Sequence, residues 1–150
     1  MDIIERIRSE HRGILGDLNE LLNGPIDNVD KYAREYLDLM AKVEAHEKGE
    51  EASIYQAIST DLDVRPIALQ SMEEHRVIRN LMRDLADVKV NEETWLPKLV
   101  VLNNMISLHF QIEEGNIFPL LDEMIAAEDK EKLDKEFEAE ESRQIQKIRG

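Results

Sequence analysis

The chain has 150 residues, which is enough for a single domain with one continuous hydrophobic core. Its 33 acidic and 19 basic residues give a formal charge of −14, so its surface repels phosphate backbones and anionic lipids. We therefore expect no nucleic-acid partner and no membrane partner. The absence of cysteine excludes disulfides, thiolate zinc sites and cysteine nucleophiles. Without a secretory signal pattern or an apolar stretch of transmembrane length, the sequence predicts a cytoplasmic protein.

Apolar residues recur at helical spacing along the whole chain. The first predicted helix begins at Asp2, with Glu5 as its capping-box partner, and ends near Asn23, just before a Gly-Pro pair. The second begins at Asp27 or Asn28 and ends near residue 58. The third covers about residues 66–85, and the fourth runs from residue 91 or 94 to about residue 119.

Pro119 is expected to end or kink the fourth helix. A short segment, residues 120–127, precedes a last helix that starts near Asp129 and is heavily charged except for one narrow apolar face. We expect that helix to be solvated and to lie along the others rather than bind a partner. Short connections between four long helices predict an all-α, up-down-up-down four-helix bundle over residues 1–127. Residues 128–150 form the additional C-terminal helix, packed on the bundle or extending from it.

Side chains that bind metals stand on the apolar faces of all four predicted long helices. Two of these helices carry a His-x-x-x-Glu pair, whose members lie on one helix face about 6 Å apart. At about 1.5 Å per residue, three of the four junctions place these side chains at matching depths. The junction of the first two helices is off by about 6 residues unless the second helix extends past the first. The candidate ligands are His11, His46, Glu50, His75, His109 and Glu113.

A lone histidine on an apolar face is more often a hydrogen-bonded core residue than a metal ligand. A carboxylate at such a position is costly unless it is paired or bound to metal, and no lysine or arginine occupies the inner positions here. Four histidines and two glutamates at matched depth therefore predict a metal site. Imidazole and carboxylate without sulfur suit iron or manganese, with zinc or nickel as alternatives. Two bridging carboxylates with two histidines on each ion favour a dinuclear site.

Two better-known metal motifs do not fit the sequence. The segment from His46 to Glu50, HEKGE, begins like the zinc-protease H-E-x-x-H but ends in glutamate. Ferritin-type di-iron bundles use Glu-x-x-His, with the carboxylate first and three residues away. Here the histidine comes first and the spacing is four.

The combined pattern resembles the hemerythrin-like HHE cation-binding family over about residues 3–127. The residues that carry the resemblance are His11, the segment 46–50, His75, the segment 109–114 (HFQIEE) and the segment 117–121 (IFPLL). The resemblance implies a non-haem centre of two iron ions, joined by carboxylates and by an oxo or hydroxo bridge. The implied assignment is Glu50 and Glu113 as bridges, His11 and His46 on one iron, and His75 and His109 on the other.

The sequence departs from the oxygen-carrying hemerythrins, which have a second histidine on the third helix and an aspartate on the fourth. The positions one turn from His75 are Ser71 and Arg79, so the second histidine is missing. On the fourth helix Glu113 takes the place of the aspartate. This argues against reversible oxygen transport. Some family members with adjacent His and Glu on the second helix use that glutamate as an extra ligand. Glu47 is therefore a candidate seventh ligand, the alternative being a solvated residue beside the apolar stripe.

We therefore predict a di-iron protein that binds or senses a small oxidant (O₂, peroxide or nitric oxide) or handles iron. The alternative is a small di-iron enzyme, such as a peroxidase, a nitric-oxide reductase or a protein that repairs iron centres. A third possibility is a bundle that binds zinc or no metal and acts as an interaction module. Tyr36 and Tyr55 are candidate hydrogen-bond donors to a bound oxidant.

Overall fold

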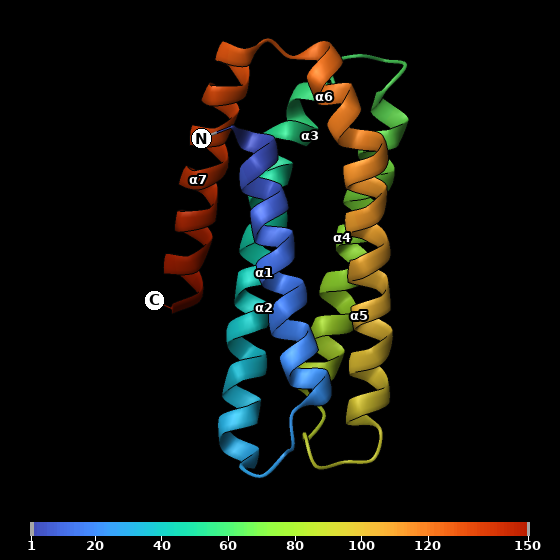
Figure 1. Cartoon of the computed structure of the whole chain (residues 1–150), viewed down its shortest axis with the longest axis vertical. Coiled ribbons are helices and arrows are strands. Elements are labelled where there is room, and N and C mark those ends of the chain that lie inside the picture. The colour runs from blue at the N-terminus through green and yellow to red at the C-terminus, as the bar shows by residue number, and fades with distance from the viewer. Residues whose placement is uncertain (1, 150) are drawn as a thin grey trace.

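The computed structural model describes residues 2–149, and every regular element in that range is helical. The helices run alternately up and down, and neighbours in space follow the order α1, α2, α4, α5 and back to α1 (Figure 1). The predicted up-down-up-down bundle is therefore confirmed. Within the described range, no helix is both long enough and apolar enough to cross a lipid bilayer. The four long helices are α1 (Ile3–Asn23), α2 (Val29–Ala52), α4 (Arg65–Ala86) and α5 (Trp95–Ile112).

Local chemistry explains where the first two helices begin and end. The side chain of Asp2 accepts a hydrogen bond from the Ile4 amide at 2.7 Å and caps α1, and Asn28 caps α2 in a similar way. Gly24 follows α1 in extended conformation, and a Cβ there would lie 2.8 Å from the carbonyl oxygen of Glu20. A larger residue would therefore disturb the end of α1.

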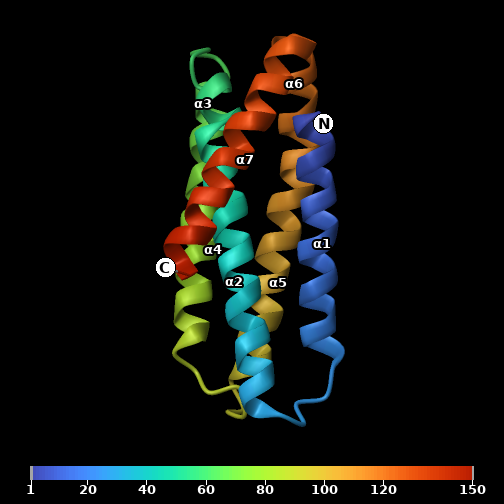
Figure 2. The same cartoon turned by 90° about the vertical axis from the view of Figure 1, so that its left-hand side faces the viewer.

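The relative extent of α1 and α2 resolves the mismatch of about 6 residues that the sequence predicts between the depths of their metal-binding side chains. The first turns of α2 extend past the end of α1 at the lower end of the bundle (Figures 1 and 2). His11 and His46 come level as a result, with ring centroids 5.0 Å apart.

Two of the predicted helices are interrupted near the upper end of the bundle. The second is divided at Ser53, after which the short helix α3 (Ile54–Ile58) follows. The fourth is interrupted just before Pro119, in agreement with the expectation that this proline ends or kinks it. A π-helical turn (Glu113–Ile117) follows α5, and Pro119 lies in the first turn of α6 (Phe118–Met124). Proline donates no amide hydrogen and crowds the preceding turn, and the wider turn makes room for it.

The C-terminal helix α7 (Ala127–Arg149) lies along α2 and contacts α1 (Figure 2). Phe137 of α7 is fully buried against Gly49 of α2, where a Cβ would lie 2.8 Å from the phenylalanine ring. Arg6 of α1 forms a two-bond ion pair with Asp134 of α7. The charged C-terminal helix is thus packed on one side of the bundle, and it begins two residues earlier than predicted.

Buried apolar side chains form two clusters, one toward each end of the bundle. The lower cluster, next to the α1–α2 and α4–α5 connections, contains Trp95 and Tyr36. The upper cluster, where α3, α6 and α7 meet the long helices, contains Tyr55 and Phe137. A layer of buried polar side chains separates the two clusters.

Candidate metal centre

The six side chains first predicted as metal ligands meet in the polar layer between the two apolar clusters. None of them is more than 1% exposed. Their nitrogen and oxygen atoms form two groups of four, and within each group the atoms lie within 4.8 Å of one another. They come from α1 (His11), α2 (His46 and Glu50), α4 (His75), α5 (His109) and the π-helical turn (Glu113).

The two groups share both glutamates and differ in their histidines. Glu50 Oε2 lies 3.3 Å from His46 Nε2, and its Oε1 lies 3.1 Å from His75 Nε2. Glu50 therefore presents one oxygen to each group, as a bridging carboxylate does. Glu113 makes the corresponding contacts with the other two histidines, at 2.9 Å and 3.3 Å. The groups are His11, His46, Glu50 and Glu113, and His75, His109, Glu50 and Glu113.

Several inward-facing atoms of the two groups are shielded from water and make no hydrogen bond. They are Nε2 of His11 and of His46, both oxygens of Glu50, and Oε1 of Glu113. They approach one another closely but without hydrogen-bond geometry. Leaving carboxylate oxygens buried in this state is costly, and no lysine or arginine of residues 2–149 is ion-paired with either glutamate. Cations held between these atoms would satisfy them, so the donor set fits a metal centre.

The outer nitrogen of every histidine in the centre is held by a carboxylate from a neighbouring helix. The contacts form a closed ring: α1 supplies a carboxylate to α2, α2 to α4, α4 to α5, and the π-helical turn after α5 to α1. A carboxylate on Nδ1 orients the imidazole and leaves Nε2 free for a metal ion. The pairs are Glu10 with His46 (2.9 Å), Glu51 with His75 (2.8 Å), Glu74 with His109 (2.6 Å) and Glu114 with His11 (2.8 Å).

Sequence reasoning missed three of these four carboxylates and assigned no partner to Glu114. A signal is present, because Glu10, Glu51 and Glu74 each stand next to a predicted ligand in the sequence. Each of them, however, contacts the histidine of another helix rather than its own neighbour. A pattern read along one helix does not reveal such a pair.

Glu47, the seventh predicted ligand, is 1% exposed but belongs to neither group of four. One of its oxygens lies 3.4 Å from Nη1 of Arg79, which also contacts Glu51 at 2.8 Å. Burial raises the pKa of Glu47 to about 7, against the opposing effect of His75 and Arg79. The alternative of a solvated residue is therefore wrong, while the role of Glu47 as a ligand stays a prediction.

The two tyrosines predicted to serve the site lie in different places. Tyr55 is fully buried, donates a hydrogen bond from its hydroxyl to Glu113, and places its ring edge-on to His75, with centroids 5.5 Å apart. Tyr36 instead donates to the carbonyl oxygen of Met82 at 2.7 Å, in the lower apolar cluster. The prediction for Tyr36 was wrong because ten residues of helix place it about 15 Å from the level of the centre.

The shared glutamates also set the proton affinity of the histidines. Burial lowers the pKa of His11, but the carboxylates of Glu113 and Glu50 outweigh that effect and raise it to about 9. In the same way carboxylates raise the pKa of His75 to about 9 and that of His109 to about 10. A metal ion must therefore displace protons from these imidazoles, which makes metal binding dependent on pH.

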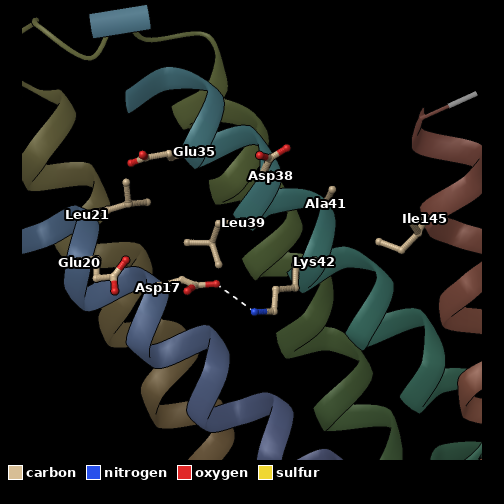
Figure 3. Close-up of a pocket in the computed structure, with 9 residues that line it drawn as sticks. All are labelled: Asp17, Glu20, Leu21, Glu35, Asp38, Leu39, Ala41, Lys42 and Ile145. Atoms are coloured by element: carbon tan, nitrogen blue, oxygen red, sulfur yellow. Dashed lines mark hydrogen bonds and ion pairs between the residues drawn. The ribbon is translucent and has the colours of Figure 1, made fainter. Parts of the chain in front are cut away.

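A hollow of about 460 Å³ between α1 and α2 is separate from this centre (Figure 3). Acidic side chains such as Glu35 and Asp38 line it, and Lys42 crosses it to pair with Asp17 at 2.9 Å. None of the seven predicted ligands lines the hollow. It is a surface groove beside the lower apolar cluster.

The fold and the site define a four-helix-bundle protein with a buried histidine and carboxylate centre suited to a metal. The chain belongs to the hemerythrin HHE cation binding domain family, whose profile matches residues 2–121. It is similar to an uncharacterized hemerythrin-like protein of Schizosaccharomyces pombe, at 21% identity over 139 residues that cover 91% of this chain and 67% of that protein. No solved structure matches the chain. The resemblance seen in the sequence is confirmed, and the whole of α7 lies beyond the residues that the family profile matches.

Proposed function

We propose that this protein holds two iron ions between its four long helices and uses them to bind or sense a small oxidant. The observation that carries the proposal is the division of the ligands into two groups that share both glutamates. Glu50 and Glu113 each direct one carboxylate oxygen to one group and the other oxygen to the second group. Two carboxylate-bridged metal ions require this arrangement.

The donor chemistry supports iron as the metal. Each group offers two imidazole nitrogens and two carboxylate oxygens without sulfur, a set that suits iron or manganese better than the thiolate-preferring metals. The four outer carboxylates strengthen the imidazoles as donors. Membership of a cation-binding family is consistent with this assignment. Manganese and zinc are the competing occupants.

The enclosure of the centre supports a ligand of only a few atoms. When bound, iron supplies the chemistry that binds or reduces O₂, peroxide or nitric oxide. The protein surrounds it with ligand side chains that are at most 1% exposed, between two apolar clusters. A larger substrate would have to separate the helices, whereas a small oxidant passes through ordinary fluctuations of the packing.

One observation favours the enzymatic alternative, the turnover of peroxide or nitric oxide. Glu47 is a buried carboxyl next to His46 in the sequence, and one of its oxygens lies 3.4 Å from Nη1 of Arg79. A carboxyl enclosed beside the centre is a candidate general acid or base for such turnover.

Absorption spectra test the proposal most simply. Protein loaded with ferrous iron under anaerobic conditions should develop near-ultraviolet and visible bands on exposure to O₂, peroxide or nitric oxide. The Glu50→Gln variant, treated identically, should not develop them. Bands that disappear when O₂ is removed indicate binding, and continued consumption of peroxide indicates an enzyme. A protein that takes up no iron, or whose iron does not respond to any of the three oxidants, contradicts the proposal.

A further inference from the structure

After Lys98, the outer face of α5 is uncharged, in contrast to the rest of this acidic chain. Residues 99–112 contain no aspartate, glutamate, lysine or arginine, and this is the longest such stretch in a sequence with a formal charge of −14. The one histidine in that stretch, His109, is buried. Large apolar side chains nevertheless face outward: Val100 is 43% exposed, and Val101 and Leu108 are each 51% exposed.

The exposed residues form a stripe along α5 at the spacing of a helix-pairing seam. Successive members are three or four residues apart, which is the repeat that helices use when they pack side by side. At about 1.5 Å per residue the stripe is about 21 Å long. We call it the α5 seam, and its members, all exposed, are Pro97, Val101, Asn104, Leu108 and Gln111.

A hollow beside the seam provides room for side chains of an opposing helix. It lies between α4 and α5, has a volume of about 570 Å³, and is lined by apolar groups of Leu81, Pro97 and Val101. The hollow is also lined by charged residues, including Asp84 and Lys98. An apolar depression with charges near it is the usual composition of a protein–protein interface.

The opposite side of the bundle shows how this protein covers such a surface. There α7 packs along α2 and α1 (Figure 1). Phe137 of α7 is buried in the space left by the missing side chain of Gly49. Among the described residues, α7 is the only long helix outside the bundle, and it lies on the side away from α5 (Figure 1). The α5 seam therefore has no covering helix from the same chain.

We infer that the α5 seam is the surface through which two copies of this chain form a dimer. A second copy carries the same formal charge of −14, so two copies repel each other least when they meet where neither presents charge. The seam is such a surface. A strongly basic partner would find no carboxylates on the seam to pair with. In a two-fold arrangement Asn104 lies near the axis, and Val101 packs near Leu108 of the partner subunit when the helices are antiparallel.

Sedimentation equilibrium on the full chain tests the inference. The unmodified protein should be dimeric at micromolar concentrations, and Val101→Glu/Leu108→Glu should raise the dissociation constant at least about 100-fold, because like charges would then face each other. The matched control is Leu37→Glu/Leu62→Glu, which adds the same charge at positions 52% and 79% exposed elsewhere and should stay dimeric. Circular dichroism should show that both variants are folded. An unmodified chain that is monomeric up to about 100 μM, or a dimer that persists in the seam variant, overturns the inference.

The lack of cysteine permits a second, positional test. Under mild oxidation Asn104→Cys should form a disulfide-linked dimer, since the two introduced thiols would lie close to the two-fold axis. The control Leu62→Cys places an exposed thiol in the α3–α4 connection and should remain largely uncross-linked. Equal cross-linking of the two variants would contradict the assignment of the seam.

Discussion

The two halves of the metal centre have the same ligand types but different surroundings. On the α1/α2 side the histidines lie against phenylalanines. The ring of His11 is stacked on Phe110 with centroids 3.7 Å apart, and His46 and Phe137 form a T-shaped pair with centroids 5.8 Å apart. Aromatic rings therefore pack directly against the histidines of this half, and one of these rings, Phe137, comes from α7.

On the α4/α5 side the histidines lie among polar groups. Tyr55 stands beside His75 and donates to the shared Glu113, and the buried Glu47 lies close to Arg79. These side chains can donate hydrogen bonds or hold protons. Carboxylates hold the histidines of both halves, so the halves differ in what else surrounds them: aromatic rings on one side, and a tyrosine hydroxyl and a buried carboxyl on the other.

The largest effect should come from the residues that the two halves share. Glu50→Gln replaces an oxygen of one group by an amide nitrogen that does not bridge two cations, so both halves should lose nearly all their iron. Iron per chain, measured after gel filtration, checks this. The exposed Glu20→Gln on α1 is the control. If Glu50→Gln keeps a full complement in either half, the sharing of the carboxylate is wrong.

The apolar half should be the more sensitive to loss of packing. Phe137 is fully buried, and Phe137→Ala should lower the free energy of unfolding by about 3–5 kcal/mol, measured by urea titration. Because Phe137 is not a ligand, the variant should still bind iron while folded. A loss below about 1 kcal/mol would show that α7 contributes little to this half.

The outer carboxylates allow the two halves to be weakened one at a time. Glu10→Gln should reduce iron affinity on the His46 side, and Glu74→Gln on the His109 side, each by about 10- to 100-fold. Competition with a chelator measures both. Glu73→Gln is a matched control, because Glu73 is the exposed neighbour of Glu74 and pairs with Arg76 rather than with a histidine. Equal affinities for the Glu73 and Glu74 variants would remove the proposed role of the outer ring.

Much of the fold could be predicted from the sequence, and so could the meeting of the four histidines with Glu50 and Glu113. Helical periodicity places each of these six side chains on the inner face of its own helix. The outer carboxylates could not be predicted, since the partner of Glu51 is on α4 and that of Glu10 on α2. The break at Ser53 was not predicted either, because no proline stands there to mark it. Pro119 does mark an interruption, but a proline alone does not specify that the turn before it is π-helical.

The pH dependence of stability should distinguish the metal-free from the iron-loaded chain. Carboxylates raise the pKa of His11 and His75 from 6.5 to about 9, and that of His109 to about 10, although burial opposes the change. Their protonated forms stabilise the fold fully below pH 6.5, and this contribution is lost as pH rises toward about 10. The thermal midpoint of chelator-treated protein should therefore fall over that range, whereas bound iron should flatten the curve. A midpoint that rises with pH in the chelator-treated protein would contradict this assignment.

The smallest effect should come from the polar half. Tyr55→Phe removes the hydroxyl that donates to Glu113, and it should cost about 0.5–1.5 kcal/mol of stability and shift the absorption bands of the iron-loaded protein. Iron content should not change. Tyr36→Phe is the matched control, since its hydroxyl bonds to a backbone carbonyl in the lower cluster and its loss should leave the spectrum unaltered. Identical spectra for the two variants would remove Tyr55 from the surroundings of the centre.

Anaerobic titration with ferrous iron counts the metal ions that the centre holds. We expect two iron ions per chain in the unmodified protein and one in each of His11→Ala and His75→Ala, because these histidines belong to different groups of four. The variant that carries both substitutions should bind almost none. A single ion in the unmodified protein, or an unchanged count in His75→Ala, would contradict a centre built from two groups that share Glu50 and Glu113.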